Sequence, residues 1–128
     1  MKNHKIFYNK LVRDDIKGRI EAKGEACEIR VIEDDAEFEQ ELLKKVREEA
    51  SSLAHTRSRE EFLQEYTDLM VVLDALTRQL GFSEADIKTA MTENVALKGF
   101  YKSRHFLHWS EDGAYKSNET PQGLKATD

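Results

Sequence analysis

Residues that interrupt helices are scarce in this chain, and this scarcity restricts its fold more than any other feature. One proline and six glycines occur in 128 residues. Barrels and sandwiches of many strands need a turn about every 8–12 residues, and turns rely heavily on these two residue types. The 39% of hydrophobic residues recur periodically over a length typical of one domain. The sequence therefore predicts an all-α globular fold.

Charged residues make up 35% of the chain, above the ~25% of typical soluble domains, and most are expected on solvated helix faces. The net charge of −5 argues against nucleic acid as a partner, because nucleic-acid-binding surfaces are usually basic. No apolar run approaches the ~18 residues that a bilayer span needs, so no membrane is expected as a partner. A single cysteine, Cys27, cannot form an intramolecular disulfide, and we expect a cytoplasmic protein.

Apolar periodicity and end signals predict four helices, at about 11–22, 35–55, 59–80 and 84–97. Asp34 or Asp35 can cap the second helix, and Ser83 caps the fourth. Gly81 and Gly99 are placed to end the third and fourth helices. Short turns between such helices predict a four-helix bundle.

Two segments lie outside these helices. Polar and apolar residues alternate over 26–32, which predicts either one short strand or an extended connector. Residues 110–128 contain almost no apolar side chains, so we expect a mobile tail after a single domain at 1–109.

Several carboxylates do not fit a solvated helix face. The apolar stripe of the helix at 35–55 consists of Phe38, Leu42, Val46 and Leu53. Glu49 falls near the middle of this stripe and Glu48 at its edge, since each residue advances by ~100°. The stripe at 59–80 consists of Phe62, Tyr66, Leu69, Leu73, Leu76 and Leu80, with Glu61, Glu65, Asp68 and Val72 along one border. Two acidic edges are thus expected to meet between the packed helices.

Carboxylates brought together in this way repel unless cations neutralise them. Oxygen ligands without His or Cys suit Mg²⁺, or Mn²⁺, rather than zinc. A di-iron site would need Glu-x-x-His pairs, which these helices do not supply. The alternative is that the acids pair with nearby basic side chains, for which the candidates are Lys44, Lys45, Arg47 and Arg57.

Four segments in order resemble one superfamily. These are YNKLVRDDI at 8–16, VREEA at 46–50, EYTD at 65–68 and KGFYKSRHFL at 98–107. The pattern is similar to that of the all-α nucleotide pyrophosphohydrolases, which include MazG, the dimeric dUTPases and phosphoribosyl-ATP pyrophosphohydrolase. The nearest likeness is to the small phosphoribosyl-ATP pyrophosphohydrolase-like members that begin with a KLVRD segment.

This resemblance implies an EExxE and ExxD signature whose carboxylates hold Mg²⁺ on the phosphates of a nucleotide. By position, Glu48 and Glu49 match the first pair, and Glu65 and Asp68 match the second. Ser52 stands where the superfamily usually has a third glutamate. Glu61, one turn before Glu65, is the candidate substitute.

The activity that the resemblance implies is hydrolysis of a nucleoside triphosphate to monophosphate and pyrophosphate, with Glu48 or Glu49 activating a water. Basic side chains must then hold the phosphates, and the candidates are Lys10, Arg13, Lys98, Lys102 and Arg104. Phe7, Tyr66, Asn94 and Trp109 are candidates for base recognition. The alternatives are a nucleotide-binding or assembly module with weakened catalysis, marked by Ser52, and phosphoribosyl-ATP hydrolysis itself. The chain has a limited core, and members of the superfamily typically assemble their bundles into dimers or tetramers. Both considerations predict a homodimer or homotetramer.

Overall fold

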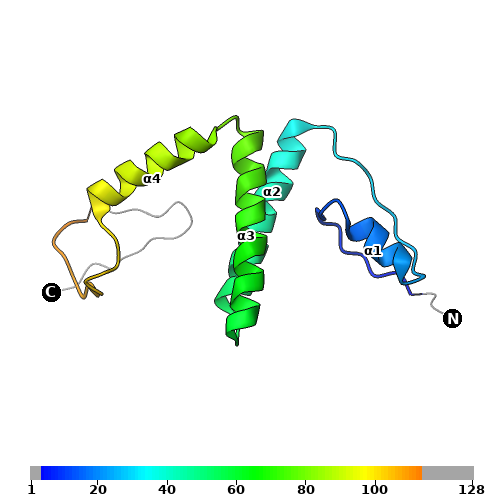
Figure 1. Cartoon of the computed structure of the whole chain (residues 1–128), viewed down its shortest axis with the longest axis horizontal. Coiled ribbons are helices and arrows are strands. Elements are labelled where there is room, and N and C mark those ends of the chain that lie inside the picture. The colour runs from blue at the N-terminus through cyan, green and yellow to red at the C-terminus, as the bar shows by residue number, and fades with distance from the viewer. Residues whose placement is uncertain (1–3, 114–128) are drawn as a thin grey trace. The chain divides into compact units, whose positions relative to one another are not determined.

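A computed structural model describes residues 4–113, and these residues form four helices and no strand (Figure 1). The helices are α1 (Ile16–Ala22), α2 (Asp35–Ala54), α3 (Arg59–Gln79) and α4 (Glu84–Lys98). The all-α prediction is confirmed, and the four helices are consistent with the predicted bundle. Residues 26–32 are an extended connector rather than a strand. The tail prediction for 110–128 falls largely outside the described residues.

Local end signals set the bounds of the long helices. The Asp34 carboxylate accepts a hydrogen bond from the Glu37 backbone N–H at 2.9 Å, and the Ser58 hydroxyl accepts one from the Glu61 N–H at 3.1 Å. These side chains satisfy amide donors that have no partner within the first turn of a helix. Gly81 follows α3 with φ +82°, a left-handed conformation that glycine adopts without strain. The predicted bounds of α2 and α3 are therefore correct to within one residue.

Ser83 and Asp86 form a reciprocal cap at the start of α4. The Asp86 N–H donates to the Ser83 hydroxyl at 3.1 Å, and the Ser83 N–H donates to the Asp86 carboxylate at 2.8 Å. These hydrogen bonds lower the pKa of Asp86. Aspartate thus fills the place that glutamate or glutamine usually takes in a capping box.

Helix α1 begins at Ile16, five residues later than the periodicity predicted. The segment before it is extended, and two of its basic side chains, Lys10 and Arg13, contact carboxylates on α2 and α3. Contacts with distant parts of the chain therefore compete with helix formation here, and an analysis of local periodicity does not include them.

The α2–α3 hairpin holds the best-packed part of the structure. Leu42 of α2 is 3% exposed and Val72 of α3 is 7% exposed, and no other described hydrophobic residue is as deeply buried. Within the described part of this region, α2 and α3 pack against each other, whereas α1 makes no comparable contact with either. The hairpin therefore fixes which side chains of the two helices meet.

The packed face of α3 differs from the predicted one. Val72, placed on the border of the apolar stripe, is buried, whereas Phe62, Tyr66 and Leu80 of the stripe are about half exposed. The apolar surface of α3 is wider than one partner helix can cover, so α2 covers only one side of it. As a result, the acidic border of the stripe lies close to the packed face.

The chain divides between Lys88 and Thr89 into two compact units, and each is described by itself. The first contains the N-terminal segment and helices α1 to α3; the second contains the end of α4 and the chain beyond it. None of the helices in the described range 4–113 has the length and apolar character required to cross a bilayer.

Candidate metal centre

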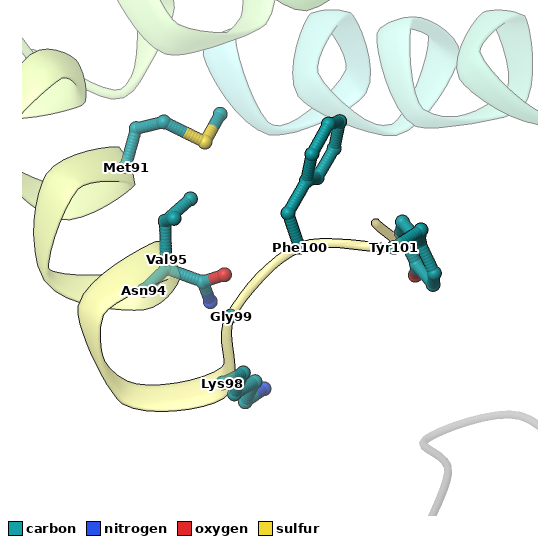
Figure 2. Close-up of a pocket in the computed structure, with 7 residues that line it drawn as sticks. All are labelled: Met91, Asn94, Val95, Lys98, Gly99, Phe100 and Tyr101. Carbon is teal, nitrogen blue, oxygen red and sulfur yellow. The ribbon is translucent and has the colours of Figure 1, made fainter. Parts of the chain in front are cut away.

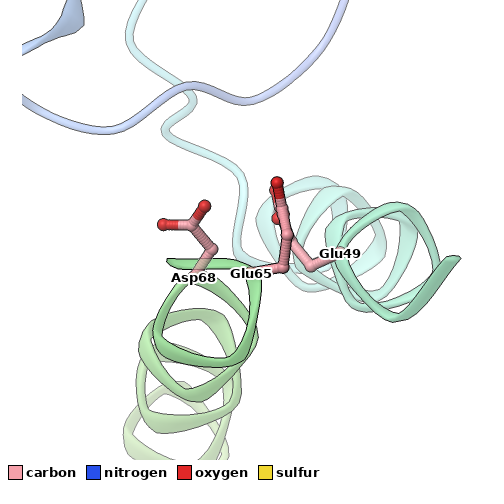
Figure 3. Close-up of side chains that lie close together, drawn as sticks. All are labelled: Glu49, Glu65 and Asp68. Atoms are coloured by element: carbon pink, nitrogen blue, oxygen red, sulfur yellow. The ribbon is translucent and has the colours of Figure 1, made fainter. Parts of the chain in front are cut away.

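Three carboxylates come together on the α2–α3 hairpin. Glu49 of α2 and Glu65 and Asp68 of α3 each offer an oxygen within 4.8 Å of the others, and all three residues are half-buried. Figure 3 shows Glu49 of α2 next to Glu65 of α3, with Asp68 beside them on α3. We call these residues the carboxylate triad. The predicted meeting of two acidic edges is thus observed for these three side chains.

The helical register explains the triad. Glu49 lies two turns after the buried Leu42, so it occupies the same face of α2. Asp68 lies one turn before the buried Val72, and Glu65 lies three residues before Asp68. Packing of the two apolar side chains therefore directs the three acids toward one another.

Glu48 is not part of the triad, although it is adjacent to Glu49 in sequence. One of its carboxylate oxygens accepts a hydrogen bond from the Lys10 ammonium at 2.7 Å, and the other accepts one from Lys45 at 3.0 Å. These hydrogen bonds lower the pKa of Glu48. Neighbouring residues on a helix are ~100° apart, so Glu49 belongs to the triad whereas Glu48 lies beside it and pairs with lysines.

Lys45 connects the two glutamates. Its ammonium lies 3.0 Å from Glu48 and 3.3 Å from Glu49, and its side chain is only 17% exposed. Burial opposes the charge of Lys45, but hydrogen bonds to the two glutamates outweigh it and raise the pKa of Lys45. Pairing with a lysine, the alternative to a metal, is therefore observed for Glu48 and for Glu49, while Glu65 has no basic partner among the described residues.

Glu65 lies close to other carboxylates whose negative charges are not fully neutralised. Desolvation, followed by the charges of Asp68 and Glu49, raises the pKa of Glu65 above its ordinary value. The ionised form of Glu65 is thus disfavoured by its surroundings, and a bound cation would reverse this.

We expect the raised pKa of Glu65 to be visible in a titration. In metal-free protein its carboxyl should titrate above the ordinary range, and Mg²⁺ should lower this pKa. The native state then holds the proton more tightly than the unfolded state, so Glu65 favours folding at low pH. That contribution is lost as the pH rises through the raised pKa.

Carbon-13 NMR of the glutamate carboxyls measures this pKa, and Asp68→Asn should lower it because one repelling charge is removed. A Glu65 pKa at or below the ordinary value in metal-free protein would contradict the expectation.

The triad fits a hard divalent cation. An octahedral Mg²⁺ with oxygen ligands at ~2.1 Å places opposite ligands about 4.2 Å apart and leaves other positions to water. The triad oxygens lie within 4.8 Å of one another, which is close to this spacing. The donor set contains carboxylate oxygen alone, which favours Mg²⁺ or Mn²⁺ over zinc.

A scan of protein-family models and searches of curated proteins and of solved structures found no match to this chain.

Two further acidic-motif positions lie outside the triad. Glu61, the candidate substitute for a third glutamate, is exposed in the first turn of α3. Its charge is close enough to contribute to the raised pKa of Glu65. Ser52 is exposed near the end of α2.

The basic candidates divide between the two units. Lys10 and Arg13 contact acids of the hairpin: Lys10 pairs with Glu48, and the Arg13 guanidinium lies 3.3 Å from Asp68. Asn94, Lys98, Lys102 and Arg104 belong to the second unit, so the structure does not place them relative to the triad.

Asn94 and Lys98 line a surface groove of about 400 Å³ in the second unit (Figure 2). Its other walls are Met91, Val95, Gly99, Phe100 and Tyr101. The sequence predicted binding roles for Asn94 and Lys98 but did not predict this apolar surface. The four-residue spacing of Met91 and Val95, followed by two aromatic residues, was the available signal.

Proposed function

We propose that this protein is a divalent-metal-dependent nucleotide pyrophosphohydrolase of the cytosol, which converts a nucleoside triphosphate to monophosphate and pyrophosphate. The observation that carries the proposal is the carboxylate triad. Its oxygens come from two helices and lie within 4.8 Å of one another, and basic side chains lie beside it. Acidic and basic groups side by side are what a metal–polyphosphate ligand requires.

In this proposal Glu49, Glu65 and Asp68 hold the metal. When bound there, Mg²⁺ or Mn²⁺ would neutralise the polyphosphate and lower the pKa of a water. The water oxygen attacks the α-phosphorus, and the bond to the bridging oxygen of the leaving pyrophosphate breaks. Glu49 or Glu48 accepts the proton of the water. The ion pair with Lys45 orients both glutamates on α2.

The proposed substrate-binding residues are basic or amide side chains. Lys10 and Arg13 border the triad and are suited to the phosphates. Lys98, Lys102 and Arg104 of the second unit stay sequence-based candidates for binding phosphate, and Asn94 stays one for the base. Non-canonical nucleotides are included among the substrates, since no described feature restricts the base.

The test is a panel of nucleoside triphosphates, canonical and modified, together with phosphoribosyl-ATP, assayed for pyrophosphate release with Mg²⁺ or Mn²⁺ and with chelator. We expect turnover of at least one compound, and its loss with chelator. No turnover across the panel would contradict the proposal.

A binding or assembly module with weakened catalysis is the second candidate. Two observations favour it. Serine stands at position 52, and the triad contains three acids, fewer than the EExxE and ExxD signature of the superfamily that this sequence resembles. Nucleotide binding without pyrophosphate release would select this candidate.

We also propose that the protein is a homodimer or homotetramer. Leu63, Tyr66 and Met70 lie on one face of α3 and are 43–62% exposed. Contiguous apolar surface of this kind on a helix usually marks an interface. A second copy of the chain is the proposed occupant because one chain buries few apolar side chains.

Light scattering should give at least twice the 14.8 kDa of one chain. Leu63→Lys combined with Met70→Lys should shift the mass toward one chain, because two charges enter the proposed interface. Val31→Lys is the control, since Val31 is 79% exposed in the connector. A mass of one chain for the unmodified protein would contradict the proposal.

A further inference from the structure

The segment before α1 contacts the α2–α3 hairpin, because two of its cations pair with carboxylates on different helices. We call residues 8–13 the strap. Lys10 pairs with Glu48 of α2 at 2.7 Å, and Arg13 pairs with Asp68 of α3 at 3.3 Å. These pairs join residues 38 and 55 positions apart in the sequence. The strap therefore connects both helices of the hairpin to the N-terminal segment.

The conformation of the strap favours these contacts. Asn9 has φ +47°, a left-handed conformation that asparagine tolerates better than most residues. The Lys10 ammonium also lies 5.8 Å from the centre of the Tyr8 ring, a distance that permits a cation–π interaction. Lys10 is thus held between an aromatic ring and a carboxylate.

The strap cations differ from Lys45 in how readily they can leave. Lys45 belongs to α2 itself, is 17% exposed and contacts two glutamates. The side chains of Lys10 and Arg13 are 41% and 61% exposed, and each has one ion-pair partner among the described residues. Exposed ion pairs of this kind contribute little to stability, so a stronger competitor can displace them.

A divalent cation on the triad would be such a competitor. Asp68 belongs to the triad and also holds Arg13, so a metal ion and the guanidinium would compete for the same carboxylate. Two positive charges on one carboxylate group also repel each other. Lys45 does not contact Asp68 or Glu65 in this structure, and it remains as the fixed counterion of α2.

We propose that the strap is an exchangeable counterion: it neutralises Glu48 and Asp68 without metal, and metal binding to the triad releases Arg13 and loosens the strap. The freed guanidinium then lies at the edge of a metal-loaded site, where it can bind substrate phosphate. The last step rests on the proposed function, whereas the exchange between strap and metal requires only the triad. The order of binding is therefore metal first and nucleotide second.

Calorimetry of Mn²⁺ binding to the full chain, with no nucleotide present, tests the exchange. Arg13→Gln removes the competing charge, so the Kd for Mn²⁺ should fall by about 3-fold to 10-fold; Lys10→Gln should have a smaller effect because Glu48 lies outside the triad. Arg30→Gln is the matched control. Arg30 is an exposed arginine before α2 that pairs with Glu37, away from the triad, and its loss should leave the Kd unchanged.

Limited trypsin cleavage after Arg13 gives a second readout. Arg13 is protected while it is paired with Asp68, so Mn²⁺ should accelerate this cleavage several-fold, whereas cleavage after Arg30 should not change. Mass spectrometry of the fragments separates the two sites.

The outcomes distinguish the exchange from the proposed function. Equal Mn²⁺ affinity in the unmodified chain and Arg13→Gln, or weaker affinity in the variant, would overturn the exchange and leave the enzyme proposal intact. Tighter binding in Arg13→Gln together with accelerated cleavage would support the exchange even if no nucleotide is hydrolysed. Absence of Mn²⁺ binding in both proteins would overturn both proposals.

Discussion

Glu49→Gln is expected to abolish pyrophosphate release, with a loss of about 10²–10⁴-fold in kcat, the range typical of removing a group that moves a proton. Glu49 is the only triad member supplied by α2, so it alone brings an oxygen from that helix to Glu65 and Asp68. The amide of glutamine is a weaker metal ligand and cannot accept the proton of a water. Mn²⁺ affinity should therefore fall by at least about 10-fold as well.

The stability of Glu49→Gln should stay close to that of the unmodified protein. Glu49 lies among like charges, and removing one charge relieves repulsion with Glu65. The amide oxygen can still accept a hydrogen bond from Lys45. A loss of activity without a loss of stability would separate a role in the site from a role in folding.

Glu41→Gln is the matched control for this experiment. Glu41 is also on α2, its side chain is 17% exposed against 14% for Glu49, and it also pairs with a lysine, Lys44. It lies outside the triad, so its replacement should leave kcat and Mn²⁺ affinity unchanged. Retained activity in Glu49→Gln, or an equal loss in Glu41→Gln, would contradict the assignment of the triad.

Leu42→Ala is expected to cause the largest loss of stability, about 2–5 kcal/mol, the usual range for truncating a buried leucine. Leu42 is 3% exposed, which is the lowest value in the described part of the chain, and it packs where α2 meets α3. Because Leu42 and Glu49 lie on one face of α2, loss of this packing should also separate the triad and weaken Mn²⁺ binding.

Urea denaturation followed by circular dichroism measures the effect. Leu43→Ala is the control: it removes the same atoms from the adjacent residue, which is 57% exposed, and should change the free energy of unfolding by no more than about 0.5 kcal/mol. Similar losses in the two variants would show that the buried face of α2 is assigned incorrectly.

Helix positions were predictable because their determinants are local. Asp34, Ser58 and Ser83 accept hydrogen bonds from amides within three residues, and Gly81 ends α3 through its own backbone conformation. The beginning of α1 was not predictable, because Lys10 and Arg13 contact residues 38 and 55 positions away. Local signals do not contain that information.

The candidate site was predictable as a set of residues but not as an arrangement. Periodicity alone directed Glu49, Glu65 and Asp68 toward a neighbouring helix, and the structure brings these three together. Periodicity placed Glu49 near the middle of the stripe and Glu48 at its edge, but it did not predict that Lys10 and Lys45 hold Glu48 outside the triad. A wide apolar stripe leaves the rotation of a helix undetermined by a fraction of a turn. The same uncertainty misplaced the packed face of α3.

By itself, the sequence determined the helices, their capped ends and the acidic character of the facing edges, because these depend on residues a few positions apart. The tertiary structure decided which acids meet and which cations neutralise them. Packing of Leu42 and Val72 fixes the rotation of α2 and α3, and this rotation assigns Glu49 to the triad and Glu48 to Lys10 and Lys45. Side-chain chemistry is thus encoded locally, whereas the pairing of side chains between the helices and the strap requires contacts between distant segments.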